Sequence, residues 1–210
     1  MKVASGSQSS QKSSMKTSRL TKKIISGQFK GKILRLPSKT TTRSSKSIVL
    51  ESFFNTLQFD IVNATFVEVF SGSGSIGLEA LSRGAKKILF MEKDRDALRV
   101  LKENISLTDP SACEVFSGDS FLNINAVVKS LKQKNEEAYF YIDPPFCIRE
   151  GMEDIYAKMI NLIASLDKEC VKLIIIEHMT GLEIPEHIGE YSLKKSKKFG
   201  NTTLSYLDVE

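Results

Sequence analysis

A four-residue motif, Asp143-Pro144-Pro145-Phe146, closes an apolar stretch that begins at Ala138. Neither proline has an N–H to donate, and Asp143 is biased toward an extended backbone because it precedes a proline. The turn therefore presents acceptors, the Asp143 carboxylate and the Pro144 carbonyl, which suit a substrate that brings an amine. Phe146 offers a face on which an extruded base could stack. The alternative interpretation is a rigid turn at a strand end, with Phe146 in the core.

The exocyclic amine of a nucleobase is a poor nucleophile because its lone pair is delocalised into the ring. Hydrogen bonds to Asp143 and Pro144 would favour a more tetrahedral nitrogen, whose lone pair could then attack a methyl sulfonium. The motif Asp143, Pro144, Pro145 and Phe146 is therefore the candidate catalytic group.

A second motif lies in Thr65 to Gly77, where a run of β-forming residues leads into Gly72, Gly74 and Gly77. This G-x-G-x-x-G spacing predicts a tight turn, a bare backbone and then close packing of a helix on a strand. The first amides of that helix are expected to be free for a nucleotide-like ligand. The motif alone does not name the ligand, and a glycine turn without a ligand is the alternative.

Two acids flank the glycine turn. Glu92 lies 20 residues after Gly72, where an acid can accept from ribose hydroxyls, so NAD is a candidate ligand. Glu68 lies just before the turn, where a carboxylate would repel a pyrophosphate but attract an ammonium. S-adenosylmethionine carries an ammonium, a sulfonium and a ribose but no phosphate, and we therefore favour it over NAD.

The elements that position these motifs alternate along the chain. The patterns predict strands near 65–70, 87–92, 113–117, 138–143 and 171–177, and helices near 75–83, 94–105, 121–132 and 153–165. This alternation predicts a mainly parallel sheet whose strand ends share one crevice. Residues 191–199 and 202–209, joined by Gly200-Asn201, predict two closing strands.

The N-terminal part of the chain is basic. Residues 1–50 hold 12 Lys or Arg and no acid, whereas the remaining 160 residues hold 18 basic and 25 acidic side chains. Residues 24–37 read as a β-hairpin, 40–46 as a polar connector, and 47–57 as a helix with Ser47 as its N-cap. A basic arm on an acidic body suggests a polyanionic partner, with a solvated arm or a hairpin that covers a sheet edge as alternatives.

Other features exclude several classes. No apolar run is long enough to span a membrane, and residues 1–18 lack an apolar h-region, so we do not expect secretion. Three widely spaced cysteines and two histidines fit neither a disulfide framework nor a metal site, so we expect a cytoplasmic protein without metal. Residues 1–18 are expected to form a disordered leader, native or added.

These motifs together resemble the amino-group methyltransferases with an (N/D)PP(Y/F/W) motif, and more closely the RsmD family of bacterial 16S ribosomal RNA (guanine-N2)-methyltransferases. The resemblance runs from about residue 22 to the end and rests on IISGQFKGKILRLP, ESFFNTL, FVEVFSGSGSIGLEALSRGA, MEKDRDALRVLKENI, GDSF, DPPF and KKFGNTTLSYL. It implies a Rossmann-like, seven-stranded methyltransferase sheet with an antiparallel last strand, preceded by a small basic N-terminal extension of a β-hairpin and a helix. The implied boundaries are 19–46 for the RNA-contacting hairpin and connector and 47–210 for the methyltransferase domain.

The resemblance also implies roles for individual residues. Those expected to hold S-adenosylmethionine are Glu68, Phe70, Ser71, Gly72, Ser73, Gly74, Gly77, Glu92, Lys93, Asp119, Ser120 and Asp143. Those expected to contact RNA are Lys30, Lys32, Arg35 and Arg43. The family usually has Asp at the position of Glu68, and its Arg-Pro-Thr connector reads Arg43-Ser44-Ser45 here, which leaves the RNA contacts less defined than the cofactor site.

The function implied is methylation of a guanine N2 amine in 16S ribosomal RNA by a monomer, within an assembling small subunit and away from any membrane. A DNA adenine-N6 methyltransferase is the nearest enzymatic alternative, although 210 residues leave little room for a domain that reads base sequence. A non-catalytic RNA-binding protein of the same fold is a further alternative, and the four acids Glu68, Glu92, Asp119 and Asp143 argue against it.

Overall fold

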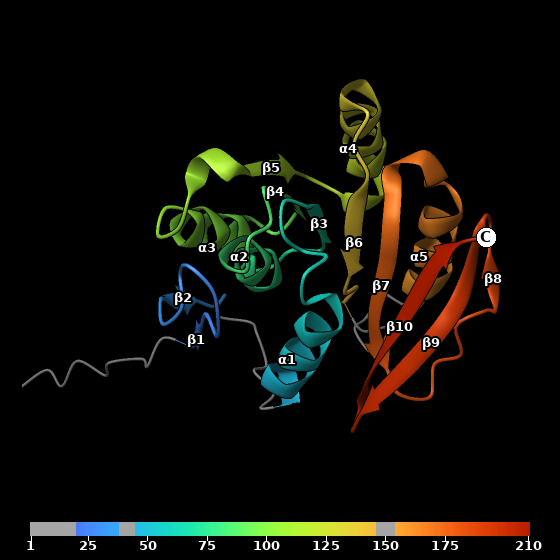
Figure 1. The fold of residues 1–210 in the computed structure, drawn as a ribbon, viewed down its shortest axis with the longest axis horizontal. Helices are drawn as coiled ribbons and strands as arrows, with labels where there is room; N and C mark the ends of the chain where they lie inside the picture. Colours follow the sequence, from blue (N-terminus) through green and yellow to red (C-terminus); the bar gives the residue numbers. More distant parts are fainter. Residues whose placement is uncertain (1–19, 38–44, 146–153) are drawn as a thin grey trace, which may run out of the picture.

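The structure is a computed structural model, and it describes residues 20–37, 45–145 and 154–210. The main elements in chain order are β1 (Thr21–Lys23), β2 (Ile33–Arg35), α1 (Ser45–Leu57), β3 (Thr65–Val69), α2 (Ser75–Ser82), β4 (Lys87–Glu92), α3 (Arg95–Ile105), β5 (Cys113–Ser117), α4 (Ser120–Lys134), β6 (Ala138–Ile142), α5 (Ile155–Ala164), β7 (Val171–Met179), β8 (His187–Ile188), β9 (Tyr191–Phe199) and β10 (Thr202–Val209). Figure 1 shows their arrangement around one central sheet.

The central sheet has eight strands in the order β5-β4-β3-β6-β7-β10-β9-β8. Strands β3 to β7 pair in parallel, and β10 runs antiparallel to both β7 and β9. The predicted α/β class, parallel strands and closing hairpin are confirmed. The two-residue strand β8 is an addition to the seven strands expected.

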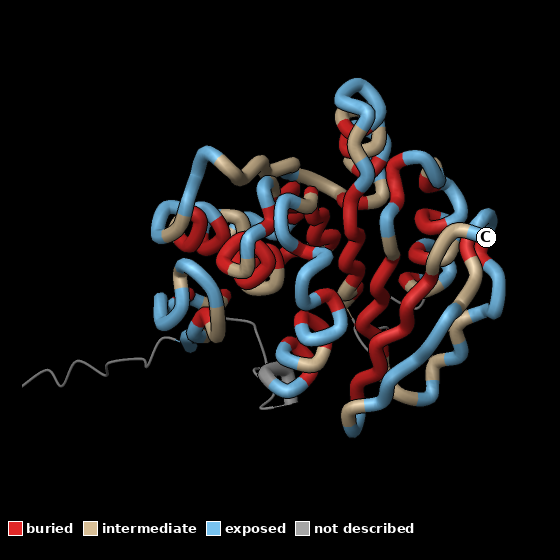
Figure 2. The backbone as a smooth tube through the Cα atoms, viewed as in Figure 1, coloured by how far each residue is buried: buried red, intermediate tan, exposed pale blue. Residues whose placement is uncertain are grey.

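Each face of the sheet is covered by helices. Side chains from α1, α2 and α3, such as Phe53, pack with Phe66 and Tyr141 on one face. Side chains from α4 and α5, such as Val127 and Met159, pack on the other. Figure 2 shows that the middle strands are buried along their length. Both aromatic side chains of α1, Phe53 and Phe54, are buried in this core.

The carboxyl ends of the parallel strands form one edge of the sheet, which we call the carboxyl rim and define by Val69, Glu92, Ser117, Ile142 and Met179. Both chemical motifs of the sequence lie on it, because each directly follows one of these strands. Asp94 and Asp119 begin α3 and α4 at the same rim by accepting hydrogen bonds from the first helical N–H groups.

The N-terminal hairpin is present, and its second strand, β2, lies within the segment expected to form it, whereas its first strand, β1, precedes that segment. β1 begins at Thr21, and Ile24 to Lys32 form the connection, which is closed by hydrogen bonds between Ile24 and both Lys32 and Gly31. Helix α1 begins at Ser45, so the expected cap at Ser47 was wrong and that residue lies inside the helix.

The hairpin is fastened to α2. The buried Glu79 carboxylate accepts from the backbone N–H groups of Ile25 (2.8 Å) and Ser26 (3.1 Å), and Ser82 bonds the backbone of Ser26 and Phe29. A Cβ on Gly27 would lie 1.7 Å from the Ser82 carbonyl oxygen, so this approach requires glycine. The basic extension is therefore held on the helix that follows the glycine turn.

Within the described stretches, no helix has the length and apolar character needed to cross a bilayer.

Candidate active site

The glycine turn brings α2 directly against β4. Gly72 and Gly74 have φ of +54° and +74°, and a Cβ on Gly77 would lie 2.6 Å from both Ile88 and Phe90. The packing role expected of Gly77 is therefore observed. A Cβ on Gly72 would meet nothing within 4 Å, whereas one on Gly74 would lie 2.3 Å from Leu101. The backbone of the turn is therefore accessible to a ligand at Gly72, whereas at Gly74 it is covered by Leu101 of α3.

Glu68 occupies the helix N-terminus that the sequence analysis expected to be open. Its buried carboxylate accepts from the N–H groups of Gly77 (2.8 Å) and Ile76 (3.3 Å). Those two amides are therefore not free for a ligand, and an anionic ligand group there would meet a carboxylate. Burial raises the pKa of Glu68 to about 8, although both hydrogen bonds act to lower it.

Glu92 holds the turn in place. One carboxylate oxygen, Oε2, accepts from the Gly72 N–H at 2.6 Å, and Oε1 accepts from the N–H groups of Lys93 and Asp94, both at 2.8 Å. A carboxylate has about four lone-pair positions, so these bonds leave one, on Oε2, for a ribose hydroxyl. Ser71 supports the same turn by donating to the Glu68 carbonyl (2.7 Å) and accepting from the Met91 N–H (2.9 Å).

Asp119 continues the rim beyond β5. Its Oδ1 accepts from the Phe121 N–H at 2.9 Å, and its Oδ2 lies 3.5 Å from the Lys93 ammonium.

Phe70, in a left-handed conformation, contacts Phe121 with ring centroids 5.3 Å apart. Asp119 and Phe121 also line a hollow of about 530 Å³ between α4 and α5. Ser120 is buried at the start of α4.

Asp143, Pro144 and Pro145 follow β6, and Asp143 is half-buried on the carboxyl rim. Phe146 lies outside the described residues. The β6–β7 pairing ends with Ile142 beside Ile176, so Asp143 and Glu177 are the next residues of the two strands. β6 lies beside β3, which places the Asp143 turn and the glycine turn at neighbouring strand ends.

A buried tyrosine–glutamate pair adjoins Asp143 and was not recognised in the sequence. Tyr141 donates to Glu177 Oε2 at 2.6 Å, and both side chains are buried. Burial and the neighbouring carboxylates hold the pKa of Tyr141 well above its usual value, so the phenol remains a donor. The only sequence signal was a glutamate at the end of the apolar run Leu173 to Ile176.

Asn104 was also missed. This fully buried side chain accepts from the Arg35 N–H (2.8 Å) and donates to the carbonyls of Arg35 and Ser73 (both 2.9 Å). It therefore joins β2 of the basic hairpin to the glycine turn. An asparagine in a polar helical segment does not predict these contacts, because Arg35 lies 69 residues and Ser73 lies 31 residues before it in the chain.

The predicted RNA-contacting residues have different surroundings. Lys32 donates to the Leu107 carbonyl, and Arg35 forms an exposed ion pair with Glu103 at 2.5 Å. Lys30 is exposed, and Arg43 lies outside the described residues. Lys22, which the sequence analysis did not single out, is nearer to the site. Its ammonium donates to Ser75 Oγ (3.3 Å) and lowers the pKa of Glu68.

Among the described residues, no group of three or more His, Cys, Asp or Glu side chains is placed to hold a metal ion.

A twisted sheet with an antiparallel β10 inserted between β7 and β9, an acid before a glycine turn and an Asp-Pro-Pro turn on the same rim are typical of the Rossmann-like methyltransferases. The comparisons agree with this class. A solved Escherichia coli structure titled "Putative methyltransferase yhhF" superimposes with a TM-score of 0.69 and 28% identity, covering 90% of this chain and 98% of that one.

A family model described as "Conserved hypothetical protein 95" matches residues 22–208, and the chain belongs to this family, the RsmD type. One curated relative is the Escherichia coli "Ribosomal RNA small subunit methyltransferase D", which is 30% identical over 178 residues, or 85% of each chain. Another, "Putative rRNA methyltransferase YlbH" of Bacillus subtilis, is 27% identical over 181 residues, which cover 86% of this chain and 95% of that protein.

Proposed function

We propose that this protein transfers a methyl group from S-adenosylmethionine to the N2 amine of a guanine in small-subunit (16S) ribosomal RNA. The observation that carries the proposal is the presence on one rim of a buried carboxylate at the glycine turn, Glu68, and an acceptor-only turn, Asp143 to Pro145. The names of the Escherichia coli and Bacillus subtilis relatives support ribosomal RNA as the substrate class.

The residues at the rim fit the cofactor. The open space above Gly72 leaves its backbone accessible, and Glu92 Oε2 has one acceptor position left for a ribose hydroxyl. A cation near Glu68 would offset the cost of ionising this buried group, whereas a pyrophosphate would increase it. This charge preference favours S-adenosylmethionine over NAD. Asp119, with Lys93 and Ser120 beside it, would complete the site at the end of β5.

The cofactor supplies an electrophilic methyl group bound to a sulfonium. Asp143 and the Pro144 carbonyl accept hydrogen bonds from the target amine and orient its lone pair toward that methyl carbon. The Asp143 carboxylate would stabilise the positive charge that the amine gains on methylation, before one amine proton leaves to solvent. Phe146 is assigned to stacking on the base.

We also propose roles for the two parts of the chain, an oligomeric state, a location and a substrate particle. Residues 19–46 contact RNA and residues 47–210 form the methyltransferase domain, which acts as a cytoplasmic monomer on an assembling subunit. A DNA adenine-N6 methyltransferase would use the same acceptor turn. Parallel assays on 16S ribosomal RNA, small-subunit particles and duplex DNA distinguish these substrates.

Glu92 provides the test of the cofactor site. Glu92→Ala removes the ribose acceptor and three bonds that shape the turn, so S-adenosylhomocysteine affinity should fall by about 2–4 kcal/mol. Isothermal titration calorimetry measures this change, with NAD as a second ligand expected not to bind. Glu114→Ala, on the neighbouring strand and paired with Lys87, is the control and should bind as the wild type. Unchanged affinity in Glu92→Ala, or binding of NAD instead, would contradict the assignment.

A further inference from the structure

Four lysines, Lys194, Lys195, Lys197 and Lys198, lie on β9 and are all exposed. They fall within five consecutive residues, which span about 13 Å at the usual rise of a strand. β8 pairs with β9 only at Ser192 and Tyr191, so the lysine-bearing part of β9 is an exposed sheet edge. We call these four side chains the β9 lysines.

The β9 lysines are not neutralised. Most other basic residues on the body of the protein pair with an acid: Lys86 with Glu136, Lys132 with Asp167 and Lys168 with Glu190 are examples. In the described part of the chain, no ion pair involves a β9 lysine. The residues opposite them on β10, from Thr203 to Tyr206, are uncharged. The strand therefore carries four positive charges on a molecule whose residues after position 50 are net acidic.

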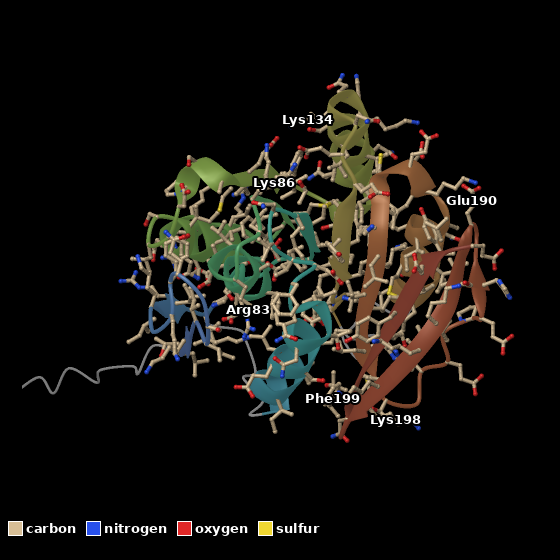
Figure 3. The ribbon with its side chains drawn as sticks, in the orientation of Figure 1. Arg83, Lys86, Lys134, Glu190, Lys198 and Phe199 are labelled. Atoms are coloured by element: carbon tan, nitrogen blue, oxygen red, sulfur yellow. The ribbon has the colours of Figure 1, made fainter. Side chains whose placement is uncertain are left out.

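The β9 lysines extend toward the carboxyl rim. Thr202 of β10 pairs with both Met179, at the end of β7, and Phe199, at the end of β9. Phe199 and Lys198 therefore lie at the same edge of the sheet as Asp143. Figure 3 shows them at the end of the molecule opposite Lys86 and Lys134, which precede β4 and β6.

Contacts hold one of these lysines beside α1 and another on β10. Lys197 donates to Ser52 Oγ of α1 at 2.6 Å and lies 5.4 Å from the Phe199 ring centroid, whereas Lys195 lies 4.6 Å from the Tyr206 ring centroid of β10. Figure 1 shows α1 between this end of β9–β10 and the β1–β2 hairpin. Basic side chains therefore lie on both sides of α1. The β9 lysines lie on one side, and the β1–β2 hairpin, which carries Lys22, lies on the other (Figure 1).

We propose that the β9 lysines form a second RNA-contacting surface, which binds phosphates of the substrate on the side of the active site away from the hairpin. This inference rests on the proposed function and adds a surface to it. Unneutralised cations along a strand that ends at the rim holding the acceptor turn suit a polyanion whose target base enters beside α1. Lysines on an edge strand also discourage sheet-to-sheet pairing, and that role alone would need no RNA.

The experiment measures affinity for in vitro transcribed 16S ribosomal RNA at several salt concentrations. Replacing the four β9 lysines by Gln should reduce the slope of log K against log salt by about 1–3, since each phosphate contact contributes roughly 0.7–0.9. Replacing them by Arg should keep the slope. The double variant Lys194→Gln with Lys198→Gln removes no contact to another side chain and should reduce the slope by about half as much. It provides the same test if the fourfold variant aggregates.

The matched control for the double variant changes Lys129 and Lys134 of α4 to Gln, because both are exposed and neither forms an ion pair within the described residues. A wild-type slope in both β9 variants, or an equal loss in the control, overturns the inference while leaving the methyltransferase assignment intact. The proposed function fails separately if the wild-type protein neither binds nor methylates the RNA, and the inference then fails with it. S-adenosylhomocysteine affinity should be the same in all variants.

Discussion

Asp143 is the residue on which the proposed chemistry depends most. Asp143→Ala removes the side-chain acceptor and should lower the single-turnover rate about 100-fold or more, which is the usual range for a positioned polar group. Asp143→Asn keeps an acceptor of similar shape without the charge, so it should lose only part of the rate. Neither variant should lose much stability, because Asp143 is half-buried at the rim. A parental rate in the alanine variant would show that Asp143 does not hold the amine.

Glu68 gives the site a pH dependence whose sign follows from its burial. The unfolded chain ionises this group near pH 4.5 and the folded protein near pH 8, so the folded state holds one more proton between those values. The free energy of unfolding should therefore fall as pH rises through this window, by at most about 1.4 kcal/mol per pH unit.

Glu68→Gln removes that titration. Urea unfolding of the wild type and the variant at pH 5, 6, 7 and 8 should show a steeper decline in the wild type, and the difference isolates Glu68 from all other groups. Parallel profiles would mean that Glu68 ionises normally in the folded protein. Bound S-adenosylhomocysteine should flatten the wild-type profile, because its ammonium would favour the carboxylate.

At the scale of elements, Asn104 connects two segments whose proposed roles differ. Asn104→Ala leaves the Arg35 N–H and the carbonyls of Arg35 and Ser73 without their partner, at a cost of about 2–4 kcal/mol in unfolding free energy. Faster hydrogen exchange in both β2 and the glycine turn, with weaker cofactor binding, is the expected result.

Arg99→Ala on the same helix is the control, since its pairs with Asp96 and Glu103 are exposed and should add little to stability. If Asn104→Ala loosens β2 but leaves the glycine turn protected, the two segments are not coupled through this side chain.

Elements with strong periodicity could be predicted from the sequence, and contacts between distant segments could not. The limits of β4, β5, β9 and β10 agree with the strands expected, because alternation and turn residues define them locally. The first strand of the hairpin was misplaced, because Ile25 and Ser26 bond to Glu79 of α2 and belong to the connection, a contact between distant segments that the sequence does not reveal. Glu68 was recognised as an acid before the turn, but its occupation of the helix amides depends on how α2 packs.

At the scale of the whole molecule, the sequence indicated a basic arm and an acidic body, and the structure refines this division. Arg35 of the arm is paired with Glu103, whereas the β9 lysines of the body are unneutralised. Net charge along the chain could not show this distribution, because the pairing of each lysine depends on its neighbours in space, and only the sheet register shows that β9 ends at the same edge as β6.

The most direct test of the account is to map N2-methylguanine in 16S ribosomal RNA from cells that lack this protein. The account predicts that one modified guanine is lost, is restored by the wild-type gene, and is not restored by Asp143→Ala at equal protein levels. An unchanged N2-methylguanine profile in the deletion strain, or full restoration by Asp143→Ala, would contradict it.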